Sequence, residues 1–245
     1  MNPTIAHIYE TLLVEDANGN RIDPFPTSLT RDRALPLYHL IRKTGARKTL
    51  EIGMAYGLST LFMCQAHQDN GGGDHTAIDP FQRSLYKSIG LLNVQRAGLD
   101  RLLRFYDATS QQALPRLLEQ QEQFDCIFID GSHLFDDAFV DFYYADKLLR
   151  HGGYLAIDDI WIPGVLKMCG FVLRNRCYQL APEFIVQRIG VSARLKALLK
   201  DVRRDPIDWH SIRCSAQLAW NGFWGFCVLQ KLEEGRRHWD HYRGF

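Results

Sequence analysis

Acidic side chains follow the most apolar segments of this 245-residue chain. Five short runs that are typical of buried strands each end at acidic residues. Six carboxylates at one rim repel one another, and burying them is costly unless cations or hydroxyl groups occupy the space between them. A single aspartate of this kind is as often a turn former or a helix cap, but the whole set indicates a binding site. In chain order the six are Glu51, Asp79, Asp107, Asp130, Asp158 and Asp159.

The segments that carry these residues alternate between strand-like and helix-like patterns. The apolar spacing predicts strands at 48–53, 75–78, 102–106, 124–129 and 153–157, and helices at 58–66, 84–96, 110–120 and 135–149. Ser132 is the expected N-cap of the last of these helices. Two further strands are expected at 184–188 and 223–229. Because parallel strands need crossovers, which are normally helices, the pattern predicts an α/β fold. It is a Rossmann-like, doubly wound, mostly parallel sheet with an antiparallel last strand and helices on both faces.

The turn after the first strand is rich in glycine and leads into a helix. Gly53 and Gly57 let the backbone approach a ligand closely, and the N-terminus of the next helix offers free N–H groups to an anion. Ala55 stands where a dinucleotide site has its second glycine, so the turn lacks the dinucleotide fingerprint. The alternative is a tight turn that only packs the helix on the strand. In an open parallel sheet, ligands bind beyond the carboxyl ends of the strands, which is where this turn lies.

Four motifs in this order resemble those of class I S-adenosylmethionine-dependent methyltransferases. They are Glu-Ile-Gly-x-x-x-Gly-x-Ser at 51–59, Ala-Ile-Asp-Pro at 77–80, Phe-Ile-Asp-Gly-Ser-His at 128–133 and Gly-Gly-Tyr-Leu-Ala-Ile-Asp-Asp at 152–159. The resemblance covers about residues 48–165 and the strand at 223–229. Its most similar branch contains small-molecule O-methyltransferases that use a divalent metal. They include the macrocin and mycinamicin sugar O-methyltransferases of methyltransferase family 24 and, more remotely, the catechol and caffeoyl-CoA enzymes.

The resemblance implies a set of residues that bind S-adenosyl-L-methionine. Asp79 would accept hydrogen bonds from the ribose hydroxyls, and Asp107 with Ala108 would border the adenine. A negatively charged rim also suits the sulfonium cation. The implied cofactor-binding residues are Glu51, Gly53, Tyr56, Gly57, Ser59, Asp79, Asp107, Ala108 and Asp130.

The resemblance also implies a metal and a catalytic base. Asp130, Asp158 and Asp159 would hold Mg²⁺ or another divalent cation, since oxygen-only ligands favour that class of ion over zinc. The ion would orient the acceptor oxygen and lower its pKa, while His133 would act as general base beside Asp130. The alternative for His133 is an exposed position in the first turn of a helix.

The expected activity is therefore methyl transfer to a hydroxyl group of a small molecule, such as a sugar, a phenol or another secondary metabolite. Two alternatives stay open. The same fold and cofactor are compatible with a hydroxylase-type or non-transfer role, and an aspartate after the second strand also suits the ribose of NAD in an oxidoreductase.

Composition limits the remaining classes of partner. The 29 basic and 28 acidic residues are nearly balanced, which disfavours nucleic acid, and no apolar stretch reaches the roughly 18 residues of a membrane span. Six scattered cysteines without a CxxC pair indicate a reduced, cytoplasmic protein. A homodimer is the default assembly. We expect an N-terminal extension at 1–46, a methyltransferase domain at 47–232 and a tail at 233–245.

Overall fold

The computed structural model describes residues 2–25, 27–184, 209–221, 223, 225–233, 238 and 240–244. In helix α9 (Trp209–Trp220), side chains are described from residue 213 onward. Among these residues, no helix combines the length and hydropathy that a membrane span requires. All six cysteines are free thiols, as the scattered spacing predicted.

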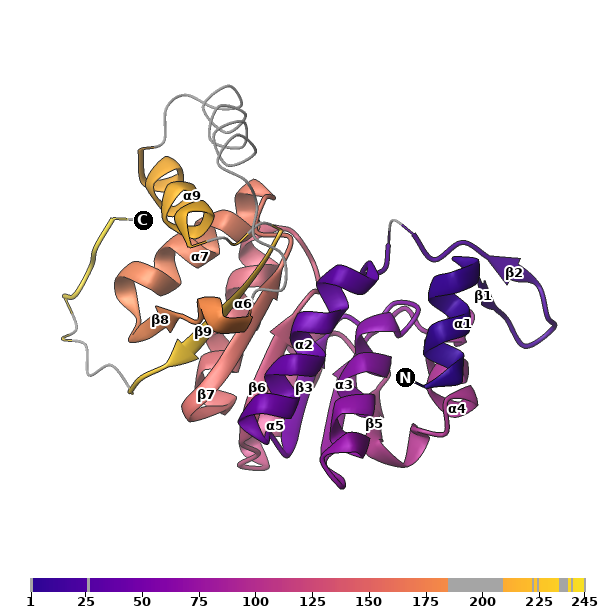
Figure 1. Cartoon of the computed structure of the whole chain (residues 1–245). Coiled ribbons are helices and arrows are strands. Elements are labelled where there is room, and N and C mark those ends of the chain that lie inside the picture. The colour runs from indigo at the N-terminus through magenta and orange to yellow at the C-terminus, as the bar shows by residue number, and fades with distance from the viewer. Residues whose placement is uncertain are drawn as a thin grey trace.

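A seven-stranded sheet forms the centre of the molecule, in the order β5-β4-β3-β6-β7-β9-β8 (Figure 1). Strands β3 to β7 run parallel, and β9 is antiparallel to both of its neighbours, β7 and β8. Along the chain, β4 and β5 follow β3 on one side of it, and β6 and β7 then follow on its other side. The strand order therefore reverses between β3 and β6. This arrangement confirms the predicted doubly wound, mostly parallel sheet. The strands are β3 (Lys48–Ile52), β4 (Asp74–Ile78), β5 (Leu103–Tyr106), β6 (Phe124–Ile129), β7 (Leu149–Asp158), β8 (Tyr178–Leu180) and β9 (Phe226–Lys231).

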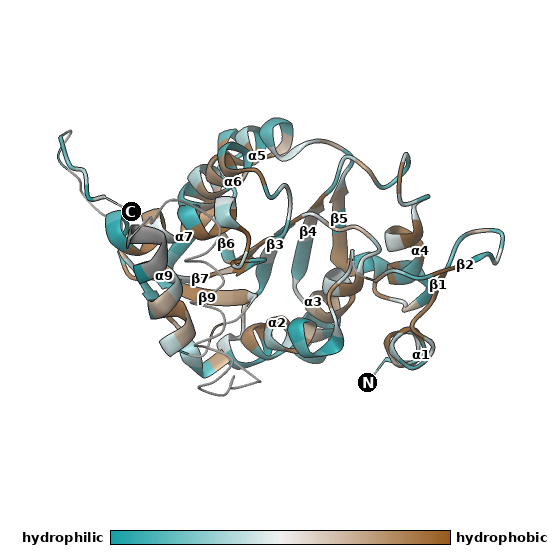
Figure 2. Cartoon of the chain, turned by 90° about the horizontal axis from the view of Figure 1, so that it is seen from above, coloured by the Kyte–Doolittle hydropathy of each residue, from teal (hydrophilic) through white to brown (hydrophobic). Residues whose placement is uncertain are grey.

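Helices cover both faces of this sheet, as the view from above shows (Figure 2). On one face lie α2 (Arg31–Thr44) and α3 (Leu58–Asp69), and on the other α5 (Ser110–Glu119), α6 (Phe135–Leu148) and α7 (Pro163–Asn175). Alternate side chains of a strand point to opposite faces, so each central strand feeds two cores. In β6, Cys126 and Phe128 pack into the core under α2 and α3. Ile127 and Ile129 pack into the core under α5, α6 and α7. Both cores fix the strand ends that carry the acidic residues.

Several predicted boundaries differ from the structure. Leu134, not Ser132, is the N-cap of α6, and β7 begins at Leu149 immediately after that helix. The glycine pair at 152–153 lies within β7, where the register with β6 shifts. Helix α4 (Ile89–Arg96) starts five residues later than predicted. Phe184 belongs to a short 3-10 helix, η2 (Pro182–Phe184), and the rest of the strand predicted at 184–188 lies outside the described residues.

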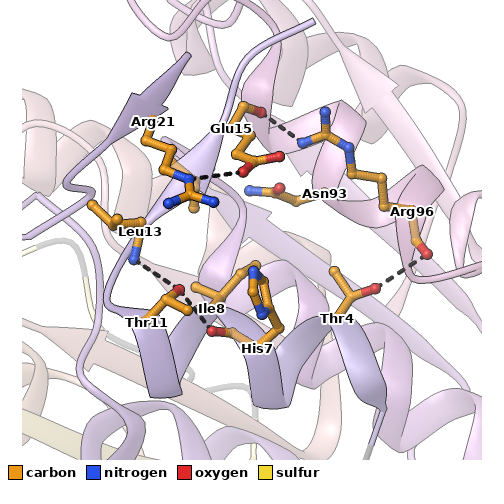
Figure 3. A pocket seen from close by; sticks show the side chains of 10 residues that line it. Thr4, His7, Ile8, Thr11, Leu13, Glu15, Arg21, Asn93 and Arg96 are labelled. Atoms are coloured by element: carbon orange, nitrogen blue, oxygen red, sulfur yellow. Dashed lines mark hydrogen bonds and ion pairs between the residues drawn. The ribbon is translucent and has the colours of Figure 1, made fainter. Parts of the chain in front are cut away.

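The N-terminal segment is fastened to the side of the sheet by α4. Helix α1 (Pro3–Thr11) and the hairpin of β1 (Val14–Glu15) and β2 (Arg21–Ile22) surround a small cavity of about 80 Å³ (Figure 3). Thr4 donates to the carbonyl oxygen of Arg96 at 3.1 Å, and the Arg96 guanidinium donates to the carbonyl oxygen of Glu15 at 2.6 Å. These contacts hold the segment that leads into α2, and α2 reaches the site.

Candidate active site

A cavity of about 780 Å³ opens at the carboxyl ends of the parallel strands, where the strand order reverses. Its volume lies within the range of about 300–1,000 Å³ that is typical of small-molecule sites. Six aspartates line it, together with Arg33 and His133, so its charge is predominantly negative. The aspartates are Asp79, Asp130, Asp137, Asp141, Asp158 and Asp159.

The glycine turn forms the wall of the cavity beside β3. Gly53 has φ +92°, and a Cβ built on it would lie 2.0 Å from the carbonyl oxygen of Asp130, so only glycine fits there. Gly57 has φ +76°, and a Cβ built on it would lie 2.9 Å from the carbonyl oxygen of Gly90, so the N-terminus of α3 packs against α4. Ala55 also adopts a positive φ, of 46°, a conformation that non-glycine residues rarely adopt. The turn is therefore shaped to bring backbone close to the cavity.

Asp79 joins the glycine turn to the end of β4. Its Oδ2 accepts hydrogen bonds from the backbone N–H groups of Met54 at 3.0 Å and Ala55 at 2.7 Å, and its Oδ1 accepts one from Phe81 at 2.7 Å. Gln82 Nε2 also donates to Oδ2, at 3.5 Å. Each carboxylate oxygen has about two acceptor positions, and Oδ1 accepts only the bond from Phe81 among the described residues, so Oδ1 has capacity for a further donor. Asp79 lines the cavity and also holds the turn in place, which combines the structural and the binding interpretations of this residue.

Glu51 lies in the interior instead of at the rim. The side chain is fully buried and its Oε2 accepts a hydrogen bond from Thr60 Oγ1 at 2.5 Å, with His75 Nε2 at 3.1 Å. Thr49 Oγ1 extends this chain to His75 Nδ1 at 2.9 Å and His67 Nε2 at 2.8 Å. The other oxygen of this carboxylate, Oε1, has no hydrogen-bond partner among the residues that the structure describes. The implied role of Glu51 beneath the cofactor stays a prediction.

The residues predicted beside the adenine lie just outside the cavity. Asp107 forms an ion pair with Arg83 at 2.9 Å, and neither it nor Ala108 lines the space. The next residues along the chain, Thr109, Ser110 and Gln111 at the N-terminus of α5, do line it.

Of two further residues predicted to bind the cofactor, Ser59 and Tyr56, one lines the cavity and one does not. Ser59 lines the cavity from the first turn of α3. Tyr56 does not line it, but its ring packs edge-on at 5.0 Å against Tyr86, which does.

Two of the three carboxylates predicted to hold a metal, Asp130 and Asp159, lie together with His133, because β6 and β7 are adjacent and in register at their ends. Among the described residues, Asp158 is not part of that group. Ligand atoms of Asp130, His133 and Asp159 lie within 4.8 Å of one another. His133 Nε2 is 2.9 Å from Asp159 Oδ2, and Trp161 Nε1 donates to Asp159 Oδ1 at 3.0 Å. Three oxygen- or nitrogen-bearing side chains at this separation fit a divalent cation.

An arginine far away in sequence occupies part of this cluster. Arg33 Nη2, from the first turn of α2, donates to Asp159 Oδ1 at 2.9 Å and also contacts Asp158 Oδ1. The Asp158 side chain is only 3% exposed, whereas that of Arg33 is 34% exposed. Arg33 therefore supplies a positive charge directly at two of the three predicted metal ligands.

Burial and mutual repulsion separate the pKa values of these groups. Burial raises the pKa of Asp130 well above its usual value, and the nearby Asp158 and Asp159 raise it further. Burial also raises the pKa of Asp158 to about 6, against the opposing charge of Arg33. For Asp159 the effect of burial is outweighed by hydrogen bonds from His133 and Arg33, so its pKa is lowered to about 2. The bond to Asp159 raises the pKa of His133. This spread is typical of functional sites.

The residues absent from the sequence-based prediction come mostly from the N-terminal segment and from α6. Residues 27–29 and Arg33 close one side of the cavity, and Asp141 of α6 lies on another. Asp141 is almost fully buried, and within the described part of the chain its Oδ1 has no hydrogen-bond partner. The sequence offered one signal for Asp141: it is a charged residue on the apolar face of a predicted helix, six residues after the start of that helix.

Comparison with known proteins finds similarity to methyltransferases. Residues 50–160, somewhat less than half of the chain, match the model of a family described as a methyltransferase domain. Over 145 residues the chain is 31% identical to a caffeoyl-CoA O-methyltransferase of Populus kitakamiensis, which corresponds to 57% of the chain and 58% of that protein. It is 30% identical to tapetum-specific methyltransferase 1 of Arabidopsis thaliana, over 53% and 54% of the two chains. The chain thus spans somewhat more than half the length of these relatives.

Solved structures share the fold along almost the whole chain. An O-methyltransferase from Bacillus cereus, in complex with SAH, superimposes with a TM-score of 0.60 at 18% identity, and covers 94% of this chain and 91% of its own. TomG of Streptomyces achromogenes, an O-methyltransferase involved in tomaymycin synthesis and in complex with SAM, gives 0.58 at 17% identity over 95% and 91%. The predicted Rossmann-like class is confirmed. The narrower similarity to macrocin and mycinamicin enzymes stays a prediction.

Proposed function

We propose that this protein is a methyltransferase that transfers the methyl group of S-adenosyl-L-methionine to a hydroxyl group of a small molecule. The observation that carries the proposal is the acid-lined cavity at the switch point of the sheet, bounded by the Gly53 turn. The names of the relatives, most of them O-methyltransferases, support the choice of oxygen as acceptor.

The methyl donor would lie along the glycine turn and the ends of β3 and β4. Asp79 would accept hydrogen bonds from the ribose hydroxyls, and Ser59 with the backbone of Gly53 would contact the amino-acid portion. We place the adenine beside Thr109–Gln111, next to the predicted pair Asp107 and Ala108. The six lining carboxylates favour a cationic sulfonium over a neutral thioether, which would help release the product.

We further propose that Asp130, Asp158 and Asp159 would hold Mg²⁺ or a similar divalent cation. When bound, such an ion would orient the acceptor hydroxyl and lower its pKa. The all-oxygen character of these three ligands and the grouping of Asp130, His133 and Asp159 support the proposal.

His133 is the proposed general base, because it faces the cavity and Asp159 fixes its ring. The His133–Asp159 contact orients the imidazole, and the acceptor proton would pass to the ring nitrogen that is free of that contact. As the carbon–oxygen bond forms, the carbon–sulfur bond breaks in line with it, so positioning is the main task of the protein. We propose in addition that the acceptor is a small molecule and that the protein is a cytoplasmic homodimer.

The proposal is tested by incubating the protein with S-adenosyl-L-methionine and a panel of small hydroxylated acceptors, and by weighing the products in a mass spectrometer. Methyl transfer predicts products heavier by one methylene unit. Products heavier by one oxygen atom would indicate the hydroxylase-type alternative and contradict the proposal. Turnover that EDTA leaves unchanged would remove the metal from the proposal and leave methyl transfer intact.

A further inference from the structure

Arg33 occupies the position where a cation bridging Asp158 and Asp159 would lie. A single nitrogen, Nη2, contacts Oδ1 of both carboxylates. A Mg²⁺ ion would need to lie about 2.0–2.1 Å from those same oxygens. Two cations do not fit between one pair of carboxylates at that range, because their mutual repulsion is strong in a partly buried site. The side chain and the ion therefore exclude each other.

The remaining acceptors of Asp159 are also in use. Its Oδ2 faces His133 Nε2 at 2.9 Å, and its Oδ1 receives Trp161 Nε1 in addition to Arg33. Asp159 therefore offers little free coordination capacity while Arg33 stays in place. Asp158 is nearly inaccessible to solvent, so its main approach is the one that Arg33 takes.

Arg33 is placed so that it can leave. About a third of its side chain is exposed. Among the described residues, its buried Nε has no hydrogen-bond partner, and the contacts of Nη2 to the two aspartates are the only hydrogen bonds that hold the guanidinium at the site. The side chain belongs to the first turn of α2, directly after residues 27–29, which line the same cavity. Withdrawal of Arg33 would release the two described ion pairs that link this turn to Asp158, at the end of β7, and to Asp159, the next residue.

We propose that Arg33 is a resident counter-ion that competes with a divalent cation for Asp158 and Asp159. It thereby sets the metal affinity of the site and couples metal binding to the N-terminal segment over the cavity. This inference rests on the metal site of the proposed function. In the metal-free protein Arg33 offsets the repulsion between carboxylates, and the ion replaces it.

The test is a calorimetric titration of Mn²⁺ into the protein without cofactor. Arg33→Met keeps the length and packing of the side chain but removes its charge, and should bind Mn²⁺ at least about tenfold more tightly than the unchanged protein. Arg33→Lys keeps the charge and should stay within a few-fold of it. Arg42→Ala is the control on the same helix, because the described bonds of the Arg42 side chain go to Asn70 and Tyr38 and not to the two aspartates, and it should change nothing.

Hydrogen exchange gives a second readout that does not depend on activity. Saturating Mn²⁺ should speed exchange of the amides at 27–34 in the unchanged protein, because the Arg33 tie is lost, and should have little effect in Arg33→Met. Mn²⁺ affinity in Arg33→Met equal to or weaker than in the unchanged protein would overturn the inference, as would the absence of Mn²⁺ binding by both.

A parallel titration with S-adenosylhomocysteine separates this inference from the proposed function. If that compound binds all variants while Mn²⁺ affinity is insensitive to Arg33, the competition is wrong and the methyltransferase proposal stands. If it binds none of them, the proposed function is wrong, and the Mn²⁺ titration still decides the role of Arg33.

Discussion

At the scale of single residues, the site is defined by carboxylates in different environments. Asp79 accepts hydrogen bonds from three backbone N–H groups, and Asp159 contacts a guanidinium, an imidazole and an indole. Asp141 is buried, and one of its oxygens has no hydrogen-bond partner among the described residues. The same residue type therefore serves as an anchor, as an ion-pair hub and as a weakly acidic group. These differences follow from neighbours distant in sequence.

Asp79 should determine affinity for the methyl donor. Asp79→Asn keeps the shape of the side chain but removes the charge, and the loss of a charge-assisted hydrogen bond, about 1.5–3 kcal/mol, should weaken binding of S-adenosylhomocysteine roughly 10- to 100-fold. Calorimetry measures this directly. Asp74→Asn, at the exposed opposite end of β4, is the control and should bind normally. Equal affinity in both variants would place the ribose elsewhere.

Asp141 should make stability depend on pH. Burial raises its pKa to about 6, above the value of about 3.9 for an unfolded aspartate, so the folded state favours the protonated form. The protein therefore loses stability as pH rises from about 4 to about 6, by on the order of 2–3 kcal/mol. Asp141→Asn should be more stable than the unchanged protein at pH 8, and the advantage should vanish near pH 4.

Urea unfolding at the two pH values measures the effect of Asp141. The exposed Asp136→Asn on the same helix serves as control and should show no such pH-dependent gain. An advantage of Asp141→Asn that is the same at both pH values would contradict the assignment.

At the scale of elements, the glycine turn depends on backbone space as much as on conformation. Gly53→Ala should destabilise the protein by about 2 kcal/mol or more, because the new Cβ meets the Asp130 carbonyl in addition to the strain of a positive φ. Gly45→Ala shares the positive φ, of 66°, but has open space around it, and should cost about 1 kcal/mol. Denaturant unfolding compares the two. Equal losses would show that the close approach to β6 is unimportant.

The elements were largely predictable, whereas the contacts that complete the site were not. The apolar run at 124–129 indicated a buried strand, and β6 has those bounds. The short strand β8 has only three residues, too few for a periodicity to appear. Arg33 lies 125 residues from Asp158, and no local pattern links them, so their pairing follows only from the way α2 packs across the sheet. For the same reason the lining role of residues 27–29 was missed.

At the scale of the whole molecule, the fold brings six aspartates from the ends of β4, β6 and β7 and from α6 to one cavity. Arg33 and His133 contact two of these aspartates and offset part of the repulsion between the carboxylates. A ligand that binds the folded state alone stabilises it in proportion to its occupancy. S-adenosylhomocysteine at about 100 times its Kd should therefore add about 2.7 kcal/mol to the free energy of unfolding. A shift in the thermal midpoint detects this gain, and NADH serves as the control that should give none.

The central claim is that the cavity beside Gly53 and Asp79 binds the methyl donor. Its most direct test is a calorimetric titration of the purified protein with S-adenosylhomocysteine and, separately, with NADH. We predict one site per chain with a Kd of about 1 μM to tens of μM for S-adenosylhomocysteine, and no heat from NADH. Binding of NADH without binding of S-adenosylhomocysteine would contradict the claim.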